Sequence, residues 1–416
     1  MTKSQLKITY ISPAWPLAKH ANGVLTYTDT MFNVLKDKAE VSVIALAETS
    51  TAGNENVYLA ASRKKSLIER LIAKCFRSSS KSMFSNMYYR FRREVTGKNI
   101  RFSLAQLPDK PDIVEVEESF GLPLVLKAST SAKVITRIHG PWFIHGPIMN
   151  KSAEKNYPAR IKAEGQGIKL SHGITAPSYD VLNQVRKYYN LPLENAVVIP
   201  NAVPPVPKPL RWRYDSNKQS ILFVGRFDLH KGGDIAINTF NLVASQNSEV
   251  EFYFLGPDRG LSIDGESFTI DNYLAKFIIN EDIRKRIHVI GQTDTATVQH
   301  YRSKCTITLV TSRYEVFSIS MVEALSTGSP VIASRIGGIP EIIKDDFNGR
   351  LAEVGNSKMF ANIAIDLLEK PEQLLRFSKN AIEDANLKYS PDAVASQTLE
   401  YYKKILNGGV GNVGLD

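Results

Sequence analysis

The sequence has little cysteine and no long apolar run. Its 416 residues include two cysteines, Cys75 and Cys305, which lie far apart, so a disulfide framework and a cysteine-rich zinc site are excluded. No apolar stretch approaches the length that a membrane-spanning helix needs. The first residues, MTKSQLKITYIS, have no apolar leader core and no small-residue cleavage site. We therefore expect an unexported, cytoplasmic globular protein that is long enough for two domains.

Two well-known phosphate-binding fingerprints are also absent. The sequence contains no Walker A pattern, GxxxxGK[ST], so a P-loop nucleotidase is not supported. The first strand is not followed by GxGxxG, so a dinucleotide-binding fingerprint is not supported either. Any nucleotide site in this chain must therefore use other groups.

Acidic residues are scarce in one segment, 63–101. It holds twelve Lys and Arg but only two acids, Glu69 and Glu94, and so accounts for the whole net charge of +10. Apolar pairs alternate with these cations, which suits an anionic membrane surface or a lipid-pyrophosphate acceptor. The other interpretation is a set of helices that cover a sheet with their apolar side and expose a basic side. Nucleic acid is a weak third option, because no nucleic-acid module accompanies the segment.

Strand-like and helix-like stretches alternate along most of the chain. Stretches that are typical of buried strands are 6–11, 41–46, 112–116, 133–138, 173–176, 196–200, 220–225, 250–255, 286–291, 305–310 and 330–334. Apolar residues recur at helical spacing in 23–38, 178–190, 231–245, 271–285, 295–302, 356–370 and 392–406. This alternation predicts an α/β protein built on doubly wound parallel sheets.

A proline-rich stretch interrupts the alternation. PNAVPPVPKPLRWRY, residues 200–214, has five prolines in its first ten residues, which prevents a regular element there. We predict a Rossmann-like domain over 1–205, a second one over 206–390, and a C-terminal helix and tail over 391–416. A return of that helix to the first domain is one option. Ligands of such sheets bind where the strands end, so we expect a cleft faced by both domains.

A mostly apolar run, EVFSISMVE, has a carboxylate at each end. Glu315 lies on the predicted loop after a strand, and Glu323 lies about two turns into the predicted helix. The backbone N–H groups of Phe317, Ser318 and Ile319 lie between them at the helix start, where they have no intrahelical acceptor. One hypothesis is that both carboxylates hold a single polyhydroxylated ligand. The alternative is a helix with an acidic start and one exposed Glu.

A pair of cations follows another strand, in FVGRFDLHKGG. Gly225 and Arg226 end the strand, and Lys231 lies five residues later at a helix start. Both cations can converge on one anion beside unsatisfied N–H groups. Two surface cations at a helix start are an equally good interpretation of this motif alone.

Two further positions lie at predicted strand ends in the first half. Gly23 opens a helix after the first strand and would let a ligand approach the backbone closely. His139 ends the strand before HGP and could bond a sugar hydroxyl or a phosphate. Taken alone, Gly23 is better explained by a plain strand-to-helix turn, and a lone histidine such as His139 is more often structural.

In order along the chain, these motifs resemble a retaining glycosyltransferase of the large family four, with the two-Rossmann GT-B fold. The resemblance is strongest over 220–350, through GRFDLHKG, GPDRG, HVIGQTD, the E-x7-E run, EALSTGSPVIAS and GGIPEIIKDDFNG. It extends more weakly to NGV, IHG, APSYDV and VIPNAV in the first half. One E-x7-E match has little meaning, but this ordered set is specific.

The resemblance implies roles for individual residues. Arg226 and Lys231 match positions that neutralise the donor diphosphate, with Gly225 beside them. Glu323 matches the residue that binds the ribose hydroxyls, and Glu315 the one that contacts the donor sugar. The remaining matches are the backbone donors of Phe317, Ser318 and Ile319, the donor-side His139, and Gly23 beside the phosphate.

The resemblance implies transfer of a hexose-type sugar, with retention, from a nucleoside-diphosphate sugar to a saccharide or lipid-linked acceptor in bacterial polysaccharide or glycoconjugate synthesis. UDP is expected before GDP. Because Arg226, Lys231 and helix N–H groups can stabilise the leaving phosphate, we expect neither metal nor cofactor. The sequence has Asn22-Gly23 and Val316-Phe317-Ser318 where the family often has Gly-Gly and Gly-Phe-Gly, which leaves the donor sugar open. Two alternatives remain: a non-catalytic nucleotide-sugar-binding protein, and a nucleotide-sugar epimerase on the same fold.

Overall fold

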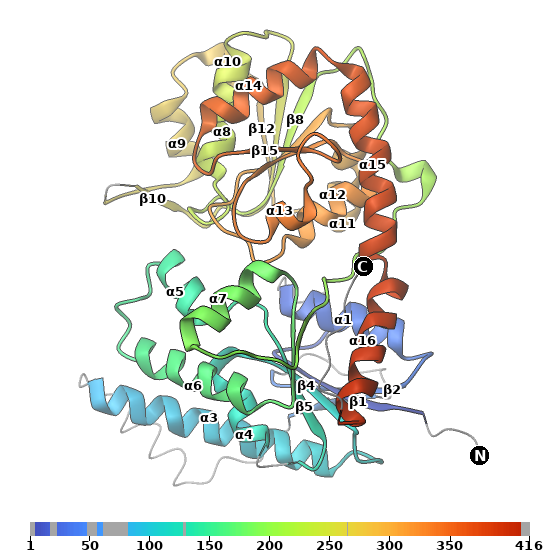
Figure 1. Ribbon diagram of the computed structural model, residues 1–416. Coiled ribbons are helices and arrows are strands. Elements are labelled where there is room, and N and C mark those ends of the chain that lie inside the picture. Colours follow the sequence, from blue (N-terminus) through green and yellow to red (C-terminus); the bar gives the residue numbers. More distant parts are fainter. Residues whose placement is uncertain are drawn as a thin grey trace. The chain divides into compact units, whose positions relative to one another are not determined.

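The computed structural model describes residues 5–16, 23–47, 56–60, 82–127, 130–263 and 265–408. By its internal contacts the chain divides into two compact units (Figure 1). Unit 1 comprises Met1–Ala202 with Pro391–Asp416, and unit 2 comprises Val203–Ser390. The sequence places the boundaries after residues 205 and 390, and the contacts place them after 202 and 390.

Unit 1 is built on a seven-stranded parallel sheet in the order β3-β2-β1-β4-β5-β6-β7. Its strands are β1 (Lys7–Ser12), β2 (Glu40–Ala45), β3 (Val57–Leu59), β4 (Ile113–Glu117), β5 (Lys133–Arg137), β6 (Gly173–Ala176) and β7 (Ala196–Val198). The central strands are buried on both faces and consist mainly of Ile, Val and Thr, as expected for a covered parallel sheet.

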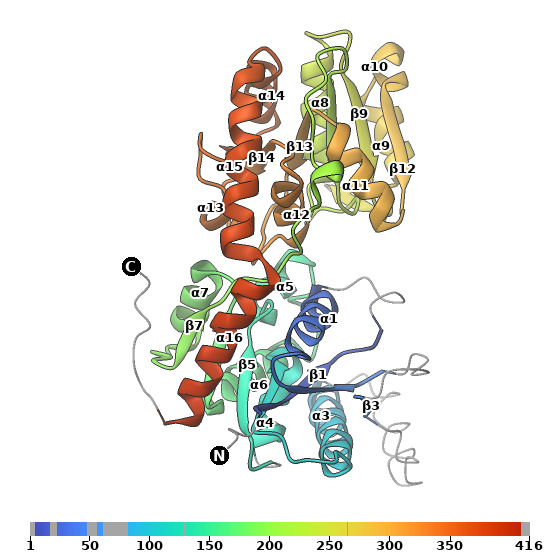
Figure 2. The ribbon, with the colours of Figure 1, turned by 90° about the vertical axis from the view of Figure 1, so that its right-hand side faces the viewer.

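Helices cover both faces of this sheet, and Figure 2 shows α1 and α3 on opposite sides of β1. The helices in the described residues of unit 1 are α1 (Gly23–Leu35), α3 (Ser82–Ala105), α4 (Leu122–Lys127), α5 (Trp142–Ile148), α6 (Tyr157–Leu170), α7 (Tyr179–Tyr189) and α16 (Pro391–Leu406), with a 3-10 turn, η2 (Ser119–Gly121). One core joins α1 and the C-terminal α16 to β1 and β2. The other joins α3 and α4 to β4 and β5. The C-terminal helix therefore belongs to the core of unit 1.

Unit 2 repeats the plan with a six-stranded parallel sheet in the order β12-β9-β8-β13-β14-β15. Its strands are β8 (Ser220–Val224), β9 (Glu251–Leu255), β12 (Ile287–Gly291), β13 (Ile307–Val310), β14 (Val331–Ser334) and β15 (Arg350–Ala352). A small hairpin is formed by β10 (Leu261–Ile263) and β11 (Glu266–Phe268). The predicted doubly wound parallel α/β architecture is confirmed for each unit.

The helices of unit 2 also divide between the two faces. They are α8 (Gly233–Ala244), α9 (Ile270–Phe277), α10 (Glu281–Lys285), α11 (Thr295–Lys304), α12 (Ile319–Thr327), α13 (Ile339–Ile342), α14 (Ser357–Leu368) and α15 (Pro371–Tyr389), with a 3-10 turn, η3 (Lys208–Leu210). An aromatic-rich core joins α8 and α14 to β8 and β9. A second core joins α12, α13 and α15 to β14.

One predicted helix, 271–285, is wrong, because the structure has two helices there. Ile278 leaves the helical region with φ −106° and ψ 81°, which ends α9. The side chain of Asn280 then accepts hydrogen bonds from the N–H groups of Asp282 and Ile283 and so caps α10. A local cap therefore prevails over a continuous apolar period.

The proline-rich stretch after residue 202 is attached to unit 2 near its two ends, at Val203 and Trp212, and is largely exposed between them. Trp212 is buried and donates its indole N–H to the carbonyl of Cys305 at 2.8 Å. Its backbone N–H bonds the carbonyl of Thr327, and that of Val203 bonds Tyr389. These contacts fix the entry of the chain into unit 2.

Candidate functional site

The loop after β8 carries the predicted cations, and Asp228 organises it. Gly225 still pairs with Leu255 through its backbone N–H. Arg226 is half exposed and donates from Nε to Asp228 Oδ2 at 2.6 Å. The other carboxylate oxygen of Asp228 accepts the backbone N–H of Lys231 at 2.7 Å. One acid, which the sequence analysis does not single out, therefore holds both predicted cations in place.

Lys231 and Glu315 are 84 residues apart in the sequence, and the fold brings their side chains into contact. Lys231 Nζ lies 2.5 Å from Glu315 Oε1, and the Ser312 hydroxyl donates to the same oxygen at 2.8 Å. Neither contact uses Oε2. Burial by itself would raise the pKa of Glu315, but the charges of Lys231 and His230 and the two hydrogen bonds together hold that pKa below its ordinary value. Glu315 is therefore an ionised carboxylate at neutral pH.

Close backbone approaches fix the position of Glu315. Gly337 has φ +57°, and a Cβ there would lie 2.2 Å from the carbonyl oxygen of Glu315. The same carbonyl accepts the N–H of Gly338 at 2.9 Å. On the Lys231 side, Gly232 has φ +69° and a Cβ would lie 2.1 Å from the Thr311 carbonyl oxygen. Only glycine fits at both places, so the loops that carry the pair meet with no intervening side chain.

Arg313 ties the same two loops together. Its guanidinium makes a bidentate contact with Asp234, with NH1 at 2.9 Å from Oδ1 and NH2 at 2.6 Å from Oδ2. It also donates to the carbonyl of Leu229. The sequence shows Arg313 only as part of a Thr-Ser-Arg loop, and its partner lies 79 residues away, so no local pattern could reveal this contact.

The second glutamate of the E-x7-E run lies on α12 beside an arginine. Glu323 Oε2 is 2.8 Å from Arg302 NH1, and about a third of the Glu323 side chain is exposed. Arg302 is almost fully buried and also donates to the carbonyl and hydroxyl oxygens of Ser320. Glu323 is therefore held on the surface by a buried cation that the sequence analysis missed.

The first turn of α12 presents backbone donors. Ser318 is the N-cap with extended φ/ψ, and its side chain makes no capping hydrogen bond. Within the described residues, the N–H groups of Phe317, Ser318 and Ile319 have no backbone acceptor. The Phe317 side chain packs edge-on against Tyr389 in the core. Main-chain N–H groups, and not the Phe317 ring, are thus what this turn offers to a ligand.

Gly23 is the first residue of α1 in unit 1. A Cβ added there would meet no atom within 4 Å, and its φ lies outside the left-handed region. Packing therefore does not require glycine at this position, and the space beside its Cα is open to a ligand. The neighbouring Asn22 lies outside the described residues.

His139 follows β5, and its loop is held by a buried acid. Glu118 accepts the N–H of His139 at 3.0 Å through Oε2 and that of Gly140 at 2.7 Å through Oε1. Burial and the nearby Arg137 lower the pKa of His139 well below its ordinary value, so its imidazole is neutral. Its ring packs edge-on against Tyr27 at 5.2 Å. A neutral imidazole there can donate or accept one hydrogen bond.

A buried polar network lies behind His139, and the sequence gives no sign of it. Glu115 accepts hydrogen bonds from the hydroxyls of Tyr27 at 2.8 Å and Tyr402 at 2.5 Å. Arg137 stacks on the Tyr27 ring and donates to Asn201 at 2.6 Å. Because Tyr402 is on α16, the C-terminal helix helps to fix the polar network that lies behind the His139 loop.

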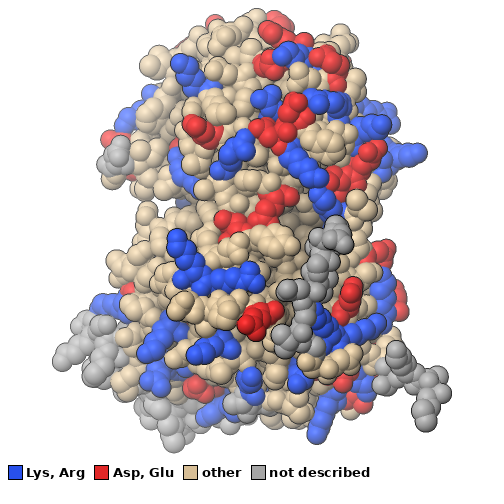
Figure 3. Space-filling view, in the orientation of Figure 1, with Lys and Arg blue, Asp and Glu red and all other residues tan. Residues whose placement is uncertain are grey.

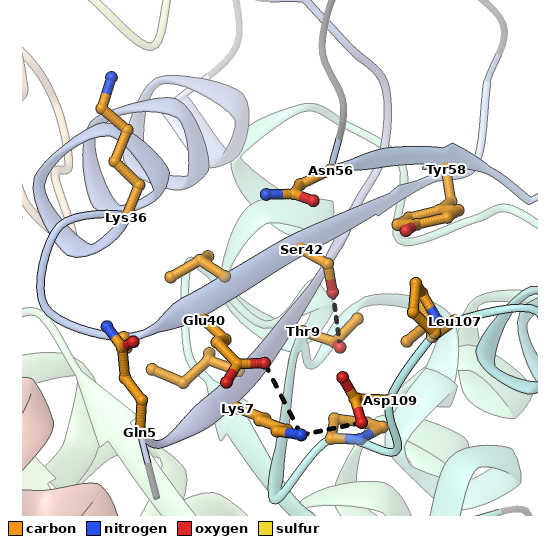
Figure 4. Close-up of a pocket in the computed structure, with 15 residues that line it drawn as sticks. Gln5, Lys7, Thr9, Lys36, Glu40, Ser42, Asn56, Tyr58, Leu107 and Asp109 are labelled. Carbon is orange, nitrogen blue, oxygen red and sulfur yellow. Dashed lines mark hydrogen bonds and ion pairs between the residues drawn. The ribbon is translucent and has the colours of Figure 1, made fainter.

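One pocket lies at the opposite, amino-terminal end of β1 and β2 (Figure 4). Its volume is about 370 Å³. Of the two cations that line it, Lys7 is matched by Asp109 at 2.9 Å and Glu40 at 3.7 Å (Figure 4). Thr9 and Ser42 bond each other across its floor. Because these groups satisfy one another, and parallel sheets bind ligands at the other edge, we do not assign this pocket a ligand.

The basic segment is only partly described. Residues 63–81 lie outside the described residues, and the rest, 82–101, forms most of α3. Lys and Arg side chains gather over α3 at the lower left of Figure 3. One face of α3 packs into unit 1 through Ile100 and Leu104, as the sheet-covering interpretation expects.

No helix in the described ranges is long and apolar enough to cross a membrane. In the same ranges, no cluster of three or more His, Cys, Asp or Glu is arranged to hold a metal ion.

Known proteins resemble this chain over nearly its whole length. Two family models match in succession, Glycosyltransferase Family 4 over residues 21–206 and Glycosyl transferases group 1 over residues 210–384. An uncharacterized glycosyltransferase of Methanocaldococcus jannaschii is 32% identical over 162 residues, which span 39% of this chain and 42% of that protein. The aligned part is thus less than half of that relative.

Solved structures show the same fold. Sucrose-phosphate synthase from Thermosynechococcus elongatus superposes with a TM-score of 0.72 at 17% identity, covering 97% of this chain and 100% of that one. Anabaena HepE in complex with UDP-glucose gives a TM-score of 0.65 at 15% identity, covering 96% of this chain and 100% of that one.

Proposed function

Because the chain belongs to the glycosyl transferases of group 1 and family 4, with the GT-B fold, we propose that it transfers a hexose-type sugar from a nucleoside-diphosphate sugar to a saccharide or lipid-linked acceptor. We propose UDP as the nucleotide, retention at the anomeric carbon and no requirement for metal. The similar fold of HepE, solved with UDP-glucose, supports the nucleotide. We place the activity in the cytoplasm, in bacterial polysaccharide or glycoconjugate synthesis.

The Lys231–Glu315 pair carries the proposal. An ionised carboxylate and an ammonium lie 2.5 Å apart at the carboxyl ends of parallel strands, on loops that two glycines bring into contact. The N–H groups of the α12 first turn follow two residues after the carboxylate. Such a mixed group suits a ligand with a polyhydroxylated part and an anionic part, and a nucleotide sugar has both.

Each group has a definable task in the reaction. Negative charge develops on the diphosphate as the glycosidic bond to phosphate breaks, and Lys231, Arg226 and the α12 N–H groups stabilise it. Glu315 is already ionised and bound to Lys231, so we assign it to orienting the sugar and stabilising cationic character, not to covalent attack. Glu323, held by Arg302, is assigned to the ribose hydroxyls. In unit 1, neutral His139 and the open position at Gly23 keep the donor-side roles that the resemblance implies.

The proposal is tested first by binding. A thermal-shift panel of UDP, GDP, ADP and their sugar conjugates, with and without Mg²⁺, should give a clear shift with one nucleotide that Mg²⁺ does not change. No shift with any nucleotide in a well-folded sample would refute the donor-site assignment.

Product analysis then separates the reaction classes. Incubation with the nucleotide sugar and a saccharide acceptor should give a free nucleoside diphosphate and a glycoside whose anomeric proton coupling matches the donor. An isomerised donor would indicate the epimerase instead. Tight binding with no product under all acceptors would indicate the non-catalytic binding protein.

A further inference from the structure

A second pocket lies in unit 1, at the carboxyl end of its sheet. It has a volume of about 440 Å³ and lies between the ends of β1, β2 and β4 and the inner face of α3. Its polar lining comes mainly from α3, through Tyr88, Tyr89, Arg92, Arg93 and Thr96. Carboxyl ends of parallel strands are where such sheets bind ligands, in contrast to the pocket of Figure 4.

Arg93 in this pocket is buried without an adequate partner. Its side chain is 10% exposed, and its ion pair with Glu94 is a long one, with 3.8 Å between Arg93 NH2 and Glu94 Oε1. Its Nε is fully buried and has no hydrogen-bond partner in the part of the chain that the structure describes. Burying a guanidinium in this way is costly unless a further group, such as a bound anion, completes its contacts.

A second buried donor is equally unsatisfied. The hydroxyl of Tyr89, a residue only 7% exposed, has no hydrogen-bond partner among the described residues. Burial and the nearby charge of Glu164 raise the pKa of Tyr89, so this hydroxyl keeps its proton and can donate. Arg92, whose guanidinium lies over the Tyr88 ring, lines the same pocket and adds a second positive charge.

A strained aromatic residue closes one side. Phe120 has φ +60°, which a bulky side chain rarely adopts, and its ring is nearly half exposed. Arg160 stacks on that ring at 4.1 Å, and Glu164 accepts the Phe120 N–H at 3.3 Å. Strain of this kind persists where the surrounding contacts impose it, and active sites and ligand clamps are among the places where it clusters.

The pocket is joined directly to the His139 loop. Glu117 lines the pocket, and the next residue, Glu118, holds the N–H groups of His139 and Gly140. Glu117 is the one acid among the described lining residues, against Arg92 and Arg93, so the pocket favours an anion. A ligand here would lie at the same edge of the sheet as the proposed donor-side residues of unit 1.

We propose that this pocket binds a phosphate group of the acceptor, with Arg93 and Arg92 as its charge partners and the Tyr89 hydroxyl as a further donor. A phosphomonoester has three terminal oxygens, one for each of these donors, whereas the two oxygens of a carboxylate would have to be shared among the three. The rings of Tyr88 and Phe120 flank the part of the ligand next to the phosphate. The inference rests on the proposed glycosyl transfer only in naming the ligand an acceptor.

Direct binding of two phosphate probes tests this inference. Titration calorimetry would measure glycerol 3-phosphate, as a soluble phosphomonoester, and a short-chain phosphatidic acid below its micelle concentration, as a lipid one. Both are measured in the wild type and in Lys231→Met, because a phosphate could also bind at the donor loop. The pocket's contribution is the binding that persists in Lys231→Met. The better probe distinguishes a soluble acceptor from a lipid-linked one.

Three variants test which side chains of α3 bind the phosphate probes. Arg93→Gln should weaken that binding at least about tenfold, and Tyr89→Phe about fivefold, as expected for one charge-assisted and one neutral hydrogen bond. Arg90→Gln, an exposed cation on the same helix, should bind the probes like the wild type. Circular dichroism would show that each variant is folded, and the nucleotide-induced thermal shift of each substitution with Lys231 retained would show that the donor site is intact.

Two outcomes would overturn the inference. In the first, Arg93→Gln combined with Lys231→Met binds both probes as tightly as Lys231→Met alone, or Lys231→Met binds neither. In the second, the wild type binds malonate but no phosphate probe, which would mean that the pocket selects carboxylates. Neither outcome would affect the donor-binding test of the proposed function.

Discussion

Lys231 and Glu315 form the most informative residue pair in unit 2, because each alters what the other can do. A lysine that is already 2.5 Å from a carboxylate is fixed in place before any ligand arrives. A carboxylate bound to that lysine stays ionised despite its burial. The pair is therefore preorganised, and removing Lys231 leaves Glu315 as an uncompensated buried charge.

Replacement of Lys231 by Met should lower the rate of sugar transfer by about 100-fold or more, as expected for the loss of one preorganised charge at a developing anion. Steady-state kinetics with the donor identified by thermal shift would measure it. Lys276→Met is the matched control, since Lys276 is paired with Glu266 on the surface. Equal rates for Lys231→Met and the wild type would contradict the role assigned to Lys231.

Glu315 should also influence stability in a pH-dependent way. Its pKa in the folded protein is lower than the ordinary value of 4.5, so the folded state favours the ionised form. That contribution is complete above the unfolded-state pKa and disappears as the pH falls through the lower folded-state value. Melting temperatures of the wild type and Glu315→Gln, followed from neutral to acidic pH, should therefore converge below about pH 4.5. A constant difference across that range would show that Glu315 is not the titrating group.

Glu323 should govern nucleotide affinity more than turnover. Glu323→Gln keeps the shape but removes the charge, and loss of a charged acceptor for a hydroxyl is expected to weaken binding about 10- to 100-fold. Arg302→Gln should weaken it in the same direction, because Arg302 positions Glu323. Calorimetric titration with UDP measures both. An unchanged UDP affinity in Glu323→Gln would remove the ribose role.

The sequence indicates this site only in part. The spacing of EVFSISMVE and GRFDLHKG identifies Glu315, Glu323, Arg226 and Lys231 as candidates, because each lies at a strand or helix end. It does not identify Asp228, Arg302 or Asp234, whose importance comes from side chains that meet only after folding. Arg302 is an ordinary helical arginine until α11 packs beside α12. Long-range partners of this kind leave no local pattern.

At the scale of elements, burial determines which predictions hold. The continuous apolar strands of both sheets are visible in the sequence because parallel strands are covered on both faces. The long helix α15, Pro371–Tyr389, has no corresponding prediction, since polar residues interrupt its apolar period in LLRFSKNAIEDANLKY. The sequence analysis also missed α6. Three of its buried residues, Glu164, Gly165 and Gly167, are not large apolar residues, so its buried face shows no apolar period in the sequence.

The sequence does not distinguish an anion-binding role of the basic segment from a membrane-binding role. The structure of α3 assigns these two roles to different residues of the helix. Arg93 is largely buried and Arg92 is exposed, but both line the pocket beside α3, whereas Arg90 and Lys98 do not line it and are exposed on the outer face with Met87 and Phe102. Arg92 and Arg93 are the residues that we assign to binding an anion in the pocket. The second pair, beside exposed apolar side chains, is the one suited to an anionic membrane surface.

Neutralising Arg90 and Lys98 together should therefore weaken binding to anionic vesicles. At about 1 kcal/mol for each cation near the surface, we expect a loss of roughly 30-fold in partitioning. Sedimentation with phosphatidylserine-containing vesicles measures the effect, and neutralised Lys276 and Lys285, exposed in unit 2, serve as the control. Equal sedimentation of the α3 variant and the wild type would exclude this membrane contact.

At the scale of the whole molecule, the two folding units are not two successive stretches of the chain, because unit 1 contains both of its ends. The chain leaves unit 1 at Ala202, forms unit 2 and returns as Pro391–Asp416. The returning helix α16 is not peripheral, because Val394, Ala395 and Tyr402 are fully buried in the core that holds α1. Tyr402 also donates to Glu115 in the network behind His139. Unit 1 is therefore complete only when the last helix is present.

Removal of residues 391–416 should unfold unit 1 while unit 2 keeps its fold. Burial of several large side chains at about 1.5–3 kcal/mol each is comparable with the whole stability of a domain. Calorimetry of the truncated protein should therefore show one transition, and that transition should still shift with UDP, because Lys231, Glu315 and Glu323 are all in unit 2. Lys403→Ala, an exposed change on α16, should leave the melting profile unchanged. If the truncated protein kept the wild-type melting profile, α16 would not be part of the folding unit that the contacts define.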